Sequence, residues 1–194
     1  MDSKAREKLI LASASPRRSE LLRKAGIDFQ VLPSSAPEPE WDGSCSPEQY
    51  VISLAVLKAS QVSARNPGRL VLGADTTVAL DDRLFGKPGD MVEAAQMLES
   101  LSGRTHKVLT GVCLCRDGSP LRSWCAVSKV TFRKLDAAAI EQYFALVNPL
   151  DKAGAYGLQC HGDLLCSGFE GLHSTVVGLP VEEVVEALAS LESV

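Results

Sequence analysis

The sequence predicts an α/β protein built on a mixed β-sheet that is flanked by helices. Strand-like apolar stretches alternate with helical segments in the first half of the chain, whereas tight turns later join strands into antiparallel hairpins. Of the 194 residues, 45% are hydrophobic, enough for one good core or for two small lobes that share one sheet. The sequence contains no linker long enough to divide the chain, so we expect residues 1–194 to form a single domain.

The first predicted unit is a strand, a helix and a second strand. Residues 8–13 (KLILAS) are largely apolar, as is typical of a buried strand. Ser15 is a good N-cap and a proline follows it, so we expect a helix over residues 16–25 that Gly26 ends. Residues 28–33 (DFQVLP) fit a second short strand.

The next unit begins with a proline- and serine-rich loop over residues 34–46. Ser46 and Gln49 have the spacing of a capping box, with proline at the first helical position. A helix over residues 47–64 is therefore predicted. A buried strand over residues 69–75 follows and ends in a carboxylate.

The second half of the chain alternates hairpins with helices, and aspartate, glycine and proline mark the turns and caps. The predicted elements are a hairpin over residues 76–88 that turns at Asp81 and Asp82, a helix over 90–103 capped by Asp90 and Glu93, a long hairpin over 105–134, a helix over 135–147, an irregular glycine-rich segment over 148–163 and a last helix from Pro180.

The composition excludes several classes of partner. The net charge of −4 provides no overall basic surface for nucleic acid, and the apolar runs are far shorter than the ~20 residues of a membrane span. The N-terminus imitates a secretory signal, but its apolar part is only LILA and two arginines soon follow. The six cysteines lack C-x-x-C and zinc spacings, and Cys113 and Cys115 alternate on one predicted strand. We therefore expect buried free thiols in a cytoplasmic protein, with no nucleic-acid or membrane partner.

Two adjacent arginines occupy an unusual position at the start of the first helix. Arg17 and Arg18 lie in its first turn, where the helix dipole disfavours cations. A polyphosphate at this helix start would explain them, because Ser13, Ser15 and the two guanidinium groups would all favour it. The alternative is that both arginines are solvated surface residues.

Asp75 ends an apolar strand, which is where open α/β sheets place their ligands. A carboxylate at this position suits a divalent cation or the activation of a water molecule. The alternative is a local cap, because Asp75 followed by two threonines can close a turn.

Three lysines occupy unusual surroundings, although a solvated lysine is the default in each case. Lys58 has apolar or small neighbours on its predicted helix and no acidic partner at i±4. Lys87 lies between a glycine and a proline, and Asp151 and Lys152 lie among small residues that let the backbone approach a ligand. Because P-loop, dinucleotide and serine-hydrolase motifs are all missing from the sequence, the residues alone indicate a phosphate-rich anion bound beside a carboxylate.

An ordered set of motifs resembles the Maf (septum-formation) family of nucleotide pyrophosphatases from about residue 9 to about residue 190. The motifs are LASASPRRSELL, LAVLKA, VLGADT, GKP, LSGRTHKVLTGV, LDKAGAYGLQ and VVGLP. The resemblance implies hydrolysis of a nucleoside triphosphate between its α- and β-phosphates, with Mg²⁺ or Mn²⁺ as cofactor. It also implies an elongated, inosine-triphosphatase-like fold with a cleft between two lobes, usually as a homodimer.

The resemblance also implies roles for individual residues. The implied assignments are phosphate binding by Ser13, Arg17 and Arg18, two functional lysines at Lys58 and Lys87, a catalytic and metal-binding aspartate at Asp75, an acidic partner at Glu38, and substrate choice by Gln159 within the segment that contains Lys152. The segment DKAGAYGLQ looks like that of the subgroup that acts on dTTP and UTP. The chain departs from the family pattern at Val147 and Asn148, and again at Leu172 and His173, which makes the base pocket less predictable.

Two alternatives stay open at this point. One is a pyrophosphatase for a modified nucleotide, such as 5-methyl-UTP, pseudo-UTP or methylated GTP. The other is a catalytically silent, nucleotide-binding regulator of division, although Asp75, Lys58 and Lys87 together argue against a silent protein. Nucleotide-pool cleansing and control of division are equally compatible with the sequence.

Overall fold

A computed structural model describes residues 8–192 of the chain. Its helices and strands are β1 (Leu9–Leu11), α1 (Pro16–Lys24), β2 (Phe29–Val31), α2 (Pro47–Ala64), β3 (Val71–Leu80), β4 (Arg83–Phe85), α3 (Met91–Leu101), β5 (Thr105–Arg116), β6 (Ser119–Phe132), α4 (Ala137–Leu146), β7 (Cys166–Glu170), α5 (His173–Val177) and α6 (Val181–Glu192). Two short 3₁₀ turns lie between α4 and β7. None of the helices described is long and apolar enough to cross a membrane.

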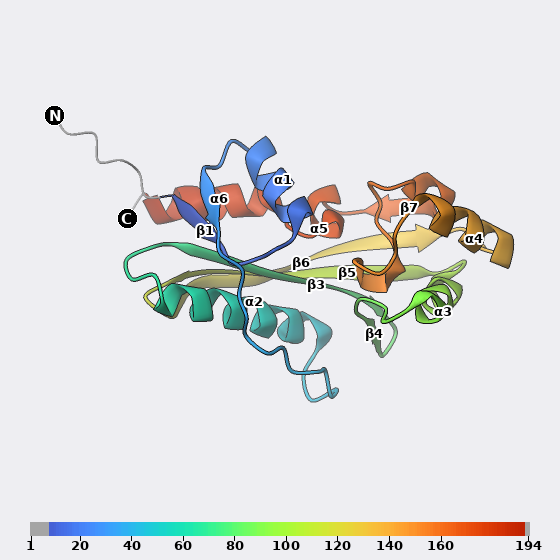
Figure 1. Ribbon diagram of the computed structural model, residues 1–194, viewed down its shortest axis with the longest axis horizontal. Helices are drawn as coiled ribbons and strands as arrows, with labels where there is room; N and C mark the ends of the chain where they lie inside the picture. The colour runs from blue at the N-terminus through green and yellow to red at the C-terminus, as the bar shows by residue number, and fades with distance from the viewer. Residues whose placement is uncertain (1–7, 193–194) are drawn as a thin grey trace.

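The strands of the described residues form one seven-stranded mixed sheet in the order β2-β1-β3-β5-β6-β7, with β4 paired to β3. β1 runs parallel to β2 and to β3, and the other pairs are antiparallel. The molecule is elongated along β3, β5 and β6, with α2 on one face of the sheet and α1, α5 and α6 on the other (Figure 1). The predicted fold class, an elongated mixed sheet flanked by helices, is confirmed.

The predicted helix starts are confirmed, with differences in how they are capped. Ser46 and Gln49 form the complete capping box at the start of α2. Ser15 stands at the N-cap of α1, but its side chain makes no capping bond within the described residues, and its N–H donates to Ser13 Oγ at 3.3 Å. Asp90 caps α3 through the Glu93 N–H, whereas the Glu93 carboxylate turns back to the N–H of Gly89.

One predicted strand needs correction, and two elements of the structure were missed. The strand expected over 69–75 continues to Leu80, so that β3 includes the first strand of the expected hairpin. β7 and α5 were not predicted. β7 is mostly exposed and lacks an apolar alternation, and α5 has only five residues, three of them β-branched.

Helix α2 packs unusually close to the sheet because two glycines leave room for it. A Cβ atom at Gly73 on β3 would lie 2.4 Å from the carbonyl oxygen of Ala55, and one at Gly111 on β5 would lie 2.2 Å from that of Val51. Cys113 and Cys115 are buried on one face under this helix, as predicted, whereas the other four cysteines are free but only partly buried. The close packing fixes the height of α2 above β3, and therefore the position of Lys58.

Candidate active site

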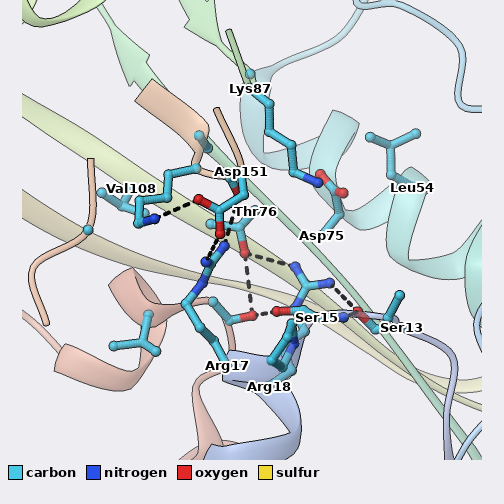
Figure 2. A pocket seen from close by; sticks show the side chains of 18 of the residues that line it. Ser13, Ser15, Arg17, Arg18, Leu54, Asp75, Thr76, Lys87, Val108 and Asp151 are labelled. Carbon is cyan, nitrogen blue, oxygen red and sulfur yellow. Dashed lines mark hydrogen bonds and ion pairs between the residues drawn. The ribbon is translucent and has the colours of Figure 1, made fainter. Parts of the chain in front are cut away.

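A cavity of about 530 Å³ opens beside the centre of the sheet, and segments from both halves of the chain line it (Figure 2). All ten residues that the sequence analysis singles out line this one cavity. They are Ser13, Ser15, Arg17, Arg18, Glu38, Lys58, Asp75, Lys87, Lys152 and Gln159. The structure therefore brings together residues from the β1–α1 loop, α1, the β2–α2 loop, α2, β3, the β4–α3 loop and the segment after α4.

The carboxylate of Asp75 meets the ammonium of Lys58 because β3 and α2 face each other there. Lys58 Nζ lies 2.6 Å from Asp75 Oδ1 and 2.9 Å from Glu38 Oε1. The side chains of Lys58 and Asp75 are only 13% and 14% exposed, whereas that of Glu38 is 48% exposed. One lysine thus holds two carboxylates at the same place, one buried and one at the edge of solvent.

The loop that carries Glu38 is tied to α2 at a second point. The hydroxyl of Tyr50 donates to the carbonyl oxygen of Pro39 at 2.9 Å. Tyr50 itself lines the cavity, so the tie lies beside the site. The Pro- and Ser-rich loop is therefore held where its carboxylate can reach Lys58.

Arg18 is held by neutral oxygen atoms. Its guanidinium donates to Gly178 O at 2.8 Å, to Ser13 Oγ at 2.9 Å and to Thr76 Oγ1 at 3.1 Å. Burial lowers the pKa of the Arg18 guanidinium, and the nearby Asp75 carboxylate opposes that shift.

Arg17 instead pairs with an acid from the far part of the chain. Its guanidinium donates to Asp151 Oδ2 at 2.6 Å and to the Asp151 carbonyl oxygen at 3.0 Å. Lys152 Nζ binds the other carboxylate oxygen of Asp151 at 2.6 Å. Burial raises the pKa of Asp151, but the hydrogen bonds and charges of Lys152 and Arg17 outweigh it, and the pKa is lowered.

Lys87 extends from the β4–α3 loop towards Asp75 (Figure 2). Within the described residues its ammonium forms no hydrogen bond or ion pair. Five cationic and three carboxylate side chains line the cavity in all, a formal charge of +2. Such a cavity at the start of α1 suits a multiply charged anion.

The carboxylates fit a divalent cation that is shared with a ligand. Asp75 and Glu38 both reach Lys58 Nζ, so their oxygen atoms lie near one another. Nowhere in residues 8–192 do three His, Cys, Asp or Glu side chains gather into a metal site. Mg²⁺ commonly takes one or two carboxylates and completes its shell with phosphate oxygens and water. The donor set therefore matches a cation that enters together with a polyphosphate.

Gln159 lies where the main cavity adjoins a second one of about 550 Å³. Lys152 lines both cavities, and Val147 and Asn148, two of the departures from the family pattern, line the second. A Cβ atom at Gly157 would lie 3.2 Å from the Gln159 side-chain nitrogen, so this glycine leaves space for the amide.

Sequence reasoning missed the link between Arg17 and Asp151 and the contribution of Thr76. The alternation of side chains along β3 carries a signal for Thr76. Asp75 faces α2, so its neighbour Thr76 must face the opposite side, where Arg18 lies. The pairing of Arg17 with Asp151 leaves no such local signal, because 134 residues separate them.

Comparisons with known proteins identify the relatives of the chain. The family model described as "Maf-like protein" matches residues 8–191. A curated protein of Moorella thermoacetica named dTTP/UTP pyrophosphatase is 48% identical over 183 residues, which cover 94% of this chain and 94% of that protein. One of the same name from Bacillus anthracis is 43% identical over 181 residues, covering 93% and 94% of the two chains.

A solved structure also shows a weak likeness. It is titled nucleoside-triphosphatase / dITP/XTP pyrophosphatase, from Mycobacterium abscessus, and it is 18% identical with a TM-score of 0.46, covering 95% of this chain and 97% of that one. A likeness of this size bears on neither fold nor function.

Proposed function

The chain belongs to the Maf-like protein family, and from that premise we propose that it hydrolyses nucleoside triphosphates, dTTP and UTP foremost, to the nucleoside monophosphate and pyrophosphate. One observation carries the proposal. The cavity surrounds the Asp75 carboxylate with five cationic side chains, an arrangement that suits a polyphosphate beside a carboxylate.

The cations bind the phosphates in this proposal. A nucleoside triphosphate brings about four negative charges at neutral pH, which more than offset the cost of two arginines at a helix start. Arg17 and Arg18 bind phosphate oxygens with the help of Ser13 and Ser15. Lys87, whose ammonium reaches towards Asp75, stabilises the charge that develops on the leaving pyrophosphate, and Lys152 assists from the far side of the cavity.

The carboxylates activate the attacking water in this proposal. Hydrolysis joins the water oxygen to the α-phosphorus and breaks the bond from the α-phosphorus to the oxygen that bridges to the β-phosphate. Asp75 or Glu38 accepts the proton that the water loses. Mg²⁺ or Mn²⁺ held by the two carboxylates would lower the pKa of a bound water and offset phosphate charge. Lys58 keeps both carboxylates at the reacting centre.

Gln159 selects the base. Its side-chain amide offers both a donor and an acceptor to the edge of a pyrimidine. A purine would lose those hydrogen bonds or clash, and unpaired polar groups in a site discriminate strongly. The names of the relatives support pyrimidine triphosphates as substrates.

Pyrophosphate release from a panel of nucleotides, with Mg²⁺ or Mn²⁺, tests the proposal. We expect release from dTTP and UTP, and a loss of about 10²–10³-fold or more in Asp75→Asn. Asp82→Asn, which changes an exposed carboxylate in the turn after β3, is the matched control and should keep full activity. Turnover confined to 5-methyl-UTP, pseudo-UTP or methylated GTP would keep the chemistry and overturn the assigned substrates. Nucleotide binding without any turnover would favour the silent regulator.

The oligomeric state and the cellular location of the protein are part of the same proposal. We propose a homodimer, because the resemblance implies one and β7 lies at an end of the described sheet with most of its residues exposed. Light scattering should then give twice the chain mass of 20.7 kDa. We place the protein in the cytoplasm, where its six free cysteines would stay reduced.

A further inference from the structure

Arg18 lies at one end of a chain of hydrogen bonds that leads into the core. Three of its five N–H groups are committed to Gly178 O, Ser13 Oγ and Thr76 Oγ1, which leaves two for a ligand in the cavity. The direction in which those two groups point depends on how firmly the three acceptors are held.

The hydroxyl of Thr110 on β5 sets the direction of the chain. Thr110 is fully buried, and its hydroxyl donates to the carbonyl oxygen of Thr175 at 2.8 Å. With its one proton used there, it accepts the proton of the Thr76 hydroxyl, whose oxygen lies 2.9 Å away, while the other acceptor within reach of that hydroxyl, Gly178 O, lies farther off at 3.4 Å. The oxygen of Thr76 then turns its lone pairs towards Arg18.

We infer that Thr110 is a positioning residue, which acts through Thr76 to aim the guanidinium of Arg18 at the phosphates of the substrate. Donors run in one direction from Arg18 through Thr76 and Thr110 to the Thr175 carbonyl oxygen, and the cation at the start of the chain polarises each bond after it. Because Thr110 has no exposed surface, it cannot contact the ligand itself. The inference rests on the proposed function.

The same chain ties Arg18 to the end of α5. Gly178 ends this helix at φ +125°, a conformation that requires glycine, and its carbonyl oxygen accepts from Arg18 Nε. The Thr175 carbonyl belongs to α5 as well. Thr110 therefore fixes the side chain of Thr76, which Arg18 contacts. It also fixes helix α5, whose Gly178 carbonyl oxygen binds the other side of the guanidinium.

The way in which Arg17 is held differs from that of Arg18, and the difference supports a preorganised Arg18. Arg17 is held by Asp151, a carboxylate that is 52% exposed and can be exchanged for a phosphate. Arg18 is held by two hydroxyls and a carbonyl that remain in place when the ligand arrives. A donor that is already in position loses little on binding, which is the physical benefit of preorganisation.

The test compares variants of Thr110 by binding and by kinetics. Thr110→Val keeps the shape and removes the hydroxyl, and Thr110→Ser keeps the hydroxyl. The matched control is Thr77→Val, because Thr77 is buried on β3 and its hydroxyl donates to Phe85 O, outside the chain to Arg18. Calorimetry with inorganic tripolyphosphate gives the affinity for the anion, and steady-state pyrophosphate release gives kcat and KM.

We expect Thr110→Val to weaken tripolyphosphate binding about fivefold and to raise KM in parallel, with kcat changed less than about twofold. Thr110→Ser should restore both values, and Thr77→Val should leave them unchanged. In an Arg18→Ala background, Thr110→Val should have no further effect on the affinity. If Thr110→Val does not fold, Thr110→Cys supplies the same comparison, since its thiol is a weak donor of similar size.

A lower unfolding temperature in Thr110→Val, with wild-type affinity and wild-type KM, would show a merely structural role and overturn the inference. Failure of the proposed function looks different. In that case the wild type binds tripolyphosphate but hydrolyses no nucleotide, and the affinity of Thr110→Val still decides whether Thr110 positions Arg18.

Discussion

The Arg17 guanidinium and the Asp151 carboxylate form an ion pair of 2.6 Å across the cavity, although they are 134 residues apart in the sequence. The pair joins the start of α1 to the glycine-rich segment after α4. Lys152 completes it by binding the same carboxylate. Asp151 therefore competes with a phosphate for two of the five N–H groups of Arg17.

We therefore expect Asp151→Asn to lower KM for the triphosphate several-fold at low salt. The substitution removes an acid that competes for Arg17 and makes the cavity more positive, and salt should weaken the gain. Asp163→Asn removes an exposed carboxylate beside the second cavity and serves as the control. A higher KM in Asp151→Asn would mean that Asp151 orients Arg17 for substrate instead of competing with it.

Gly111→Ala should destabilise the protein by about 1–3 kcal/mol and also reduce its activity. The new methyl group would lie 2.2 Å from the Val51 carbonyl oxygen, so α2 must move away from the sheet and carry Lys58 with it. Gly168→Ala is the matched change, because its Cβ would meet Thr131 at an ordinary 3.6 Å. Urea denaturation and pyrophosphate release measure the two effects. Full activity in a destabilised Gly111→Ala would show that activity does not depend on the close packing of α2 against the sheet.

His106 should make the protein less stable in mild acid. It is 1% exposed, and burial lowers its pKa from 6.5 to about 4. Between these two pH values the unfolded chain binds a proton that the folded protein does not. The free energy of unfolding should therefore fall as the pH drops through 6.5 towards 4, and the contribution of His106 to the slope should fade as the pH rises above 6.5.

From pH 7 to pH 5 the loss from His106 amounts to about 2 kcal/mol. Urea titrations at the two pH values measure it. His106→Gln should remove this part of the pH dependence, whereas His161→Gln, at an exposed position, should retain it. An unchanged pH dependence in His106→Gln would contradict the expectation.

Gln159→Ala should reduce the preference for pyrimidine over purine triphosphates, because the substitution removes the amide that we propose reads the edge of the base. The ratio of kcat/KM for UTP to that for GTP is the measurement, and we expect it to fall at least tenfold. Leu158→Ala, next to it on the same segment, provides a control for local loosening. An equal ratio in Gln159→Ala and wild type would place base selection elsewhere in the cavity.

Local signals predicted most of the fold. The capping box of Ser46 and Gln49 set the start of α2, and the turn at Asp81 and Asp82 set the β3–β4 hairpin. β7 escaped prediction because an exposed edge strand needs no apolar alternation. The extension of β3 to Leu80 was not predicted because, along one edge, its first half pairs with β1 and its second half with β4, while β5 pairs along both halves of the other edge.

The residues of the site could be predicted, but most of their partners could not. The sequence around Lys58 contains no acidic neighbour at i±4. Its partners Asp75 and Glu38 come instead from β3 and from a loop, which the local sequence does not reveal. The glycines of VLGAD and LTGV look like ordinary strand glycines until α2 is placed against them. Contacts of this kind depend on the three-dimensional packing, and side-chain periodicity along the sequence does not encode them.

The bond from Arg18 to the Gly178 carbonyl oxygen spans 160 residues, and it has a consequence for synthesis on the ribosome. The arginines and Asp75 leave the exit tunnel early, yet Gly178, which lines the cavity and binds Arg18, is made much later. A nascent chain therefore carries these side chains for several seconds without the carbonyl oxygen that holds Arg18 in place. A product that ends before residue 178 should lack this acceptor, so we expect a complete cavity only after Gly178 has been made.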